Sequence, residues 1–114
     1  MTAADRDFYR QEHLAYRGLW NLPLSADNAA ILVRKLLRTC GEGPIDVHVV
    51  PGAAWHATYH DRIEFIAGDV TPQVVVHEVA HVLHMRDAGI HSPDHDADVW
   101  NLVALLACIL EEVL

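Results

Sequence analysis

Residues 77–81 read His-Glu-Val-Ala-His and form the clearest chemical motif of this sequence. Residues four apart lie on the same face of an α-helix, so the imidazoles of His77 and His81 can reach one metal ion. Glu78 stands to the side of the two histidines, where its carboxylate can contact a water bound to that ion. The motif therefore predicts Zn²⁺ as the cofactor, with His77 and His81 as ligands and Glu78 as the catalytic base.

A catalytic zinc site needs a third protein ligand and an open position for water. The chain has 9 histidines, and most of them lie in its second half. We expect His95 to be the third ligand, because it is predicted one turn inside the last helix, on the apolar face that points to the interior. His91 in the preceding loop, Asp87 six residues after His81, and Asp98 one turn beyond His95 are the alternatives.

The elements that must position these residues follow from the periodicity of the apolar side chains. Helical spacing predicts helices over 3–18 and 26–39, the second capped by Ser25. Alternation then predicts strands over 45–50, 55–59 and 62–66, the last two forming a hairpin. Thr71-Pro72 starts a helix that runs to about Arg86, and Ser92-Pro93 starts the last helix. The order ααβββαα predicts one α+β domain over residues 1–114, with helices packed on a small three-stranded sheet.

Composition and charge exclude several classes of function. The 8 Lys and Arg against 16 Asp and Glu give a net charge of −8, which disfavours nucleic acid and anionic membranes as partners. The longest apolar run, residues 102–110, is about half of what a membrane crossing needs. Two cysteines do not make a disulfide framework, and the acidic N-terminus does not have the pattern of a signal peptide. These features predict a cytoplasmic protein.

The stretch from Arg62 to Leu106 resembles the small zincin-like metallohydrolases of actinobacteria and their phages and, more distantly, the SprT-like minimal metalloproteases. In those families a strand precedes a helix with the His-Glu-x-x-His motif, and a histidine before an apolar or aromatic pair opens the next helix. The matching pieces here are Ile63-Glu64-Phe65-Ile66, His77-Glu78-Val79-Ala80-His81, and His95 with Val99-Trp100. The resemblance implies a zincin-like fold, with His77, His81 and His95 as zinc ligands and Glu78 as general base. The third-ligand motif of those families usually reads His-Gly-Pro-Glu, whereas Asp96-Ala97-Asp98 follows His95.

The function expected from these residues is that of a zinc-dependent metallopeptidase, which hydrolyses a peptide or another amide bond. We expect an extended peptide or protein substrate to pair with Arg62–Ala67 as an edge strand. Tyr59, His56 or His60 could donate a hydrogen bond to the developing oxyanion. The alternative is a non-catalytic zinc-binding or interaction module with the same histidine site. In a domain this small, a second copy of the chain or another protein could complete the cleft.

Overall fold

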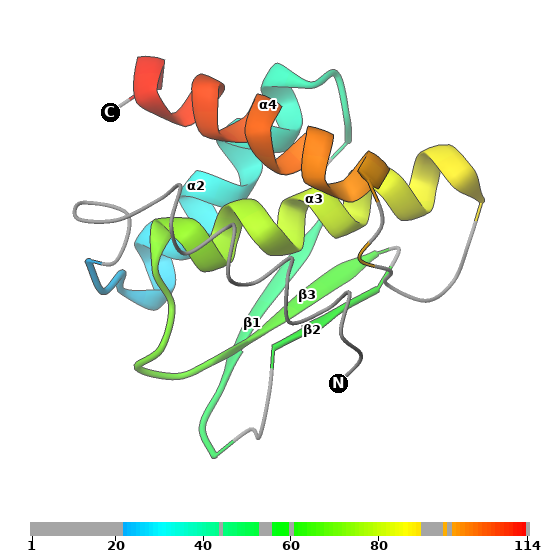
Figure 1. Cartoon of the computed structure of the whole chain (residues 1–114). Helices are drawn as coiled ribbons and strands as arrows, with labels where there is room; N and C mark the ends of the chain where they lie inside the picture. The colour runs from blue at the N-terminus through cyan, green and yellow to red at the C-terminus, as the bar shows by residue number, and fades with distance from the viewer. Residues whose placement is uncertain are drawn as a thin grey trace.

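The computed structural model describes residues 22–43, 45–52, 56–59, 61–89, 95 and 97–113. Within these ranges the chain is a small α+β structure with three helices and a three-stranded sheet. The elements are α2 (Ala26–Thr39), β1 (Asp46–Val50), β2 (Ala57–Thr58), β3 (Arg62–Ile66), α3 (Pro72–Ala88) and α4 (Ala97–Val113). The helix predicted over residues 3–18 lies outside the described residues. The three described helices lie on one side of the sheet, and α3 runs between the sheet and α4 (Figure 1).

The sheet is mixed, with the strand order β1-β3-β2. β1 is parallel to β3 from the pair Asp46 and Arg62 to the pair Val50 and Ile66. β2 is antiparallel to β3, with Ala57 opposite Glu64, which confirms the predicted hairpin. β3 is thus the central strand, so the expectation that Arg62–Ala67 is an edge strand open to a peptide was wrong. Both sides of β3 already have hydrogen-bonded neighbours, and the edges of this sheet are β1 and β2.

Burial in the sheet follows the alternation of side chains along its central strand. Ile63 and Phe65 are fully buried, whereas Arg62 is exposed and Glu64 is partly buried. Successive side chains of a strand point to opposite faces, so these two apolar residues place one face of β3 against the core. That core also contains the buried face of α2, which comprises Ala29, Leu32, Val33, Leu36 and Leu37.

α3 is buried on nearly all sides between Pro72 and Met85, as expected for a helix that is apolar all round. Thr71 caps its N-terminus, because its side chain accepts a hydrogen bond from the backbone N–H of Val74. Gly89 ends it with φ 67°, a left-handed conformation that favours glycine. The predicted start is therefore confirmed, and the helix extends two residues beyond the predicted end.

α4 begins at Ala97, and His95 lies before it in non-helical backbone. The expectation that His95 lies one turn inside this helix was wrong, and the predicted cap at residues 92–93 lies outside the described residues. The buried side of α4 includes Val99, Val103, Leu106 and Leu110. None of the described helices combines the length and apolar content that a membrane crossing needs. Cys40 and Cys108 are both free thiols.

Candidate metal centre

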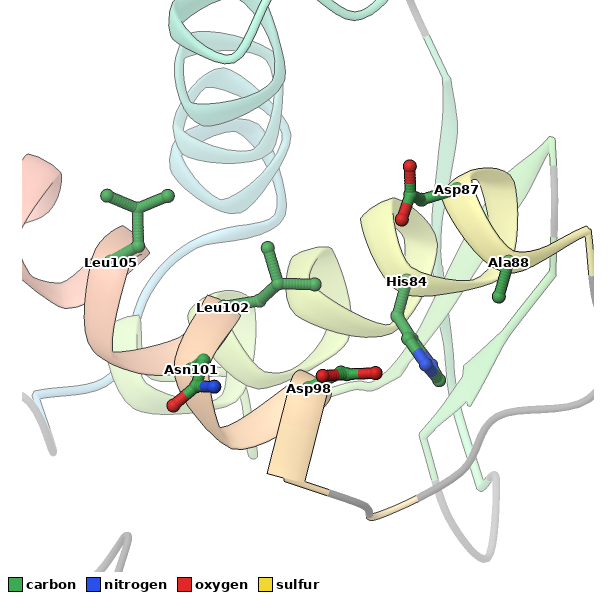
Figure 2. A pocket seen from close by; sticks show the side chains of 7 residues that line it. All are labelled: His84, Asp87, Ala88, Asp98, Asn101, Leu102 and Leu105. Carbon is green, nitrogen blue, oxygen red and sulfur yellow. The ribbon is translucent and has the colours of Figure 1, made fainter.

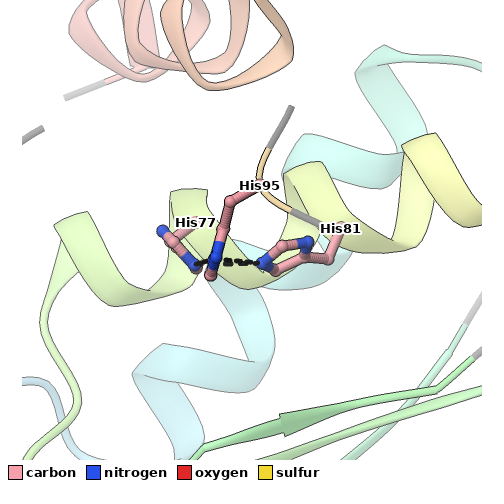
Figure 3. Close-up of side chains that lie close together, drawn as sticks. All are labelled: His77, His81 and His95. Atoms are coloured by element: carbon pink, nitrogen blue, oxygen red, sulfur yellow. Dashed lines mark hydrogen bonds between the residues drawn. The ribbon is translucent and has the colours of Figure 1, made fainter. Parts of the chain in front are cut away.

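Three histidine side chains meet at one point beside α3 (Figure 3). His77 and His81 come from successive turns of that helix and are only 4% and 3% exposed. His95 reaches them from the segment before α4 and is partly buried. The Nε2 atom of His77 is 3.0 Å from that of His81 and 3.1 Å from that of His95. The third distance, from His81 Nε2 to His95 Nε2, is also 3.1 Å, so the three atoms form a nearly equilateral triangle.

This triangle is a poor arrangement for three imidazoles without a cation between them. Each Nε2 of a neutral imidazole carries either an N–H or a lone pair, so at least two of the three atoms must present the same kind of group to each other. A metal ion would accept all three lone pairs at once. Ligands about 2.0–2.1 Å from a tetrahedral zinc ion are about 3.3 Å apart. The observed distances are within a few tenths of an ångström of that value, so the residues fit the ion.

The electrostatic state of His81 also suits a metal ligand. Burial and, after it, the neighbouring imidazoles of His77, His95 and His84 together lower the pKa of His81 to about 2. His81 is therefore neutral at ordinary pH, and the neutral ring is the form that binds metals. Its buried Nδ1 atom has no hydrogen-bond partner among the described residues.

No protein-family model, curated protein or solved structure matches this chain.

Glu78 is 8% exposed and lies on α3 next to His77. Its Oε2 atom accepts a hydrogen bond from the hydroxyl of Thr58, which is 4% exposed and belongs to β2. This bond joins the sheet to the helix and gives the buried carboxylate a donor, which a buried charge requires. Sequence reasoning missed Thr58, because no spacing rule connects a hydroxyl on a short strand with a carboxylate 20 residues later.

Among the described residues, the one group of possible metal ligands whose atoms lie within 4.8 Å of one another comprises His77, His81 and His95. The other third-ligand candidates that the structure describes, Asp87 and Asp98, are exposed and do not belong to this group. His91 lies outside the described residues.

The residues expected to stabilise an oxyanion have other contacts. His56 accepts a hydrogen bond at Nδ1 from the backbone N–H of Ile66, at 3.0 Å. Tyr59 is exposed, and the Arg62 guanidinium lies over its ring, 4.4 Å from the ring centre. His60 lies outside the described residues. The bond to Ile66 makes His56 a structural link to the end of β3.

We expect Thr58→Val to destabilise the protein by about 1–3 kcal/mol, because it removes the hydroxyl donor from a buried carboxylate while keeping the shape of the side chain. Thr58→Ser keeps the hydroxyl and should restore most of this loss. Urea denaturation measures the free energy of unfolding of each variant. Thr39→Val is the matched control, because the exposed Thr39 hydroxyl bonds only the carbonyl of Lys35. Equal effects at positions 58 and 39 would show that the buried Thr58 bond contributes no more than an exposed bond within a helix.

The burial of His56 predicts a pH dependence of stability. Burial lowers the pKa of His56 from its ordinary value of 6.5, against the opposing effects of Glu78 and Asp69. As the pH falls below 6.5, the unfolded chain binds a proton at His56 before the folded chain does, so stability decreases until the lowered pKa is passed. The loss arises because the exposed imidazole of the unfolded chain binds a proton that burial keeps from the folded one.

His56→Asn tests this prediction, because the amide oxygen can accept from Ile66 without titrating. Urea midpoints at pH 7.5 and pH 5.0, measured with a chelator present, should differ less in this variant than in the wild type. His48→Asn, at an exposed position on β1, should keep the wild-type difference. An unchanged pH dependence in His56→Asn would contradict the assignment.

Proposed function

We propose that this protein is a zinc-dependent hydrolase, most specifically a metallopeptidase that cleaves a peptide or another amide bond. The observation that carries the proposal is the convergence of three Nε2 atoms within 3.1 Å of one another, with the Glu78 carboxylate on the next residue of the same helix. Three protein ligands and one position for water are typical of catalytic zinc sites, whereas structural sites are closed by four protein ligands.

His77, His81 and His95 would hold the ion in this proposal. A bound zinc ion supplies Lewis acidity and lowers the pKa of a water molecule towards 7. Glu78 would accept a proton from the attacking water and later transfer it to the leaving amine. Thr58 donates to Oε2 of Glu78, so Oε1 is the atom that would accept the proton. The hydroxyl of Thr58 would also fix the carboxylate in one orientation.

An extended peptide or protein segment is the substrate that we propose. β2 is an edge strand of the sheet and also supplies Thr58 to the site. A peptide that pairs with β2 on the side where the described residues place no strand would therefore lie close to Glu78, and its main-chain hydrogen bonds would contribute to affinity. This replaces the expected pairing with residues 62–67, which occupy the centre of the sheet. We further propose the cytoplasm as the location, since the free thiols Cys40 and Cys108 suit a reducing compartment.

Elemental analysis combined with X-ray absorption at the zinc edge tests the proposal. We expect one zinc ion per chain, bound by three imidazole nitrogens and one oxygen of water. His48→Ala removes an exposed histidine of β1 and should leave the metal content unchanged. A spectrum with four protein ligands would instead support the non-catalytic zinc module, and a protein without stoichiometric metal would overturn the proposal.

A further inference from the structure

A groove of about 380 Å³ lies between the end of α3 and the beginning of α4. In Figure 2, the ring of His84 and the carboxylate of Asp87 extend from α3, while Asp98 and Leu102 approach from α4. His84 is 6% exposed, so its ring forms part of the buried wall. The complete lining comprises His84, Asp87, Ala88, Asp98, Asn101, Leu102 and Leu105. Its volume is within the range of sites for small molecules or single side chains.

The lining is acidic on its rim and apolar along its length. Two carboxylates and an amide stand beside two leucines and an alanine, and none of the lining residues is Lys or Arg. Arg86, the basic residue in the last turn of α3, instead pairs with Glu42, at 3.2 Å between its NH1 nitrogen and Oε2. A ligand that matches this groove carries a positive charge at the end of an aliphatic stem, as the side chains of lysine and arginine do.

The two carboxylates lie at opposite ends of their helices. Asp98 lies in the first turn of α4, where a negative charge is favourable to the helix. Asp87 lies in the last turn of α3, where the same charge is unfavourable because the carbonyl end of the helix is itself negative. A cation in the groove would therefore interact favourably with Asp87 and with the carbonyl end of α3.

The groove lies close along the chain to the residues of the histidine cluster. His84 follows His81 by three residues on α3, and Asp98 follows His95 by three residues along the chain. One turn of an α-helix rises about 5.4 Å, which is close to the spacing of alternate side chains in an extended peptide. Resting on the proposed function, we infer that this groove binds a lysine or arginine side chain of the substrate, within about two residues of the bond that is cleaved.

Binding of a single side chain tests the groove without any hydrolysis. The probe is Nα-acetyl-L-arginine N-methylamide, titrated into isotope-labelled, zinc-loaded protein and followed by the backbone amide NMR signals of Ala88, Asn101 and Leu102. The norleucine analogue, which lacks the charge, should bind at least about tenfold more weakly. The double variant Asp87→Asn, Asp98→Asn should bind the arginine probe more weakly than the wild type by a similar factor. The matched control neutralises two exposed carboxylates elsewhere, with Asp61→Asn and Asp69→Asn.

A mixed-sequence peptide pool, with products identified by mass spectrometry, tests the role in specificity. The wild type should cleave mainly within two residues of Lys or Arg, and the Asp87→Asn, Asp98→Asn variant should lose this preference while keeping its zinc. Equal binding of the arginine and norleucine probes would overturn the inference, even if the protein is an active peptidase. Cleavage without a basic preference would overturn it as well. Selective arginine binding without cleavage of any peptide would instead overturn the proposed peptidase function and leave a cation-binding groove.

Discussion

Zinc-loaded protein is expected to unfold at a markedly higher temperature than the metal-free protein. Only the folded chain brings His77, His81 and His95 together, so zinc binds the folded state and shifts the equilibrium by mass action. A free zinc concentration about 1,000 times the dissociation constant adds about 4 kcal/mol to the free energy of unfolding. In a domain of this size, this amounts to a rise in melting temperature on the order of 15 °C. Calorimetry with and without a chelator measures the difference.

Substitution of each histidine shows whether this rise comes from the proposed site. His77→Ala, His81→Ala and His95→Ala should each abolish most of the rise, whereas His48→Ala should retain it. His95→Ala is the most informative variant, because His95 lies before α4 and its loss leaves α3 intact. The metal-free His95→Ala protein should be as stable as the metal-free wild type, since it relieves the crowding of three converging nitrogens. An undiminished zinc effect in this variant would place the ion elsewhere.

The elements with strong local signals could be predicted from the sequence. Thr71, Pro72 and Gly89 mark the two ends of α3 through capping preferences that act over a single turn. The alternation of apolar and polar residues around Ile63 and Phe65 predicted the limits of β3, because it is also a local signal. The order of the strands could not be predicted, because alternation shows that a strand has a buried face and does not show which strands lie beside it.

The candidate site likewise contains contacts between residues close in the sequence, which could be predicted, and contacts between distant residues, which could not all be predicted. His77 and His81 could be placed together because four residues make about one helical turn. His95 was predicted as the third ligand on the expectation that it was helical; it does lie beside His77 and His81, but it reaches them from the segment before α4. Thr58 was missed, since its bond to Glu78 depends on how β2 packs against α3. The groove at His84 likewise depends on the packing of α4 against α3.

Glu78→Gln should abolish hydrolysis while the protein retains its zinc. The amide has the shape of the carboxylate, and its oxygen can still accept the hydrogen bond from Thr58, but it cannot take a proton from water. Loss of a general base typically lowers the rate about 10²–10⁴-fold. The rate is measured as the release of new amino groups from a mixed-sequence peptide pool, alongside the zinc content of each variant. Glu64→Gln, on the central strand β3, is the control and should keep full activity.

The same substitution should leave the protein equally stable or make it more stable. Glu78 is a buried carboxylate with a hydrogen bond from Thr58, and burial of a charge generally costs more free energy than burial of a neutral amide. The neutral amide avoids that cost, so loss of activity with a maintained or raised melting temperature would identify Glu78 as a residue whose charge serves chemistry rather than folding. If Glu78→Gln instead lowered stability and left hydrolysis unchanged, the carboxylate would be a structural partner of Thr58, and the base would have to be another group.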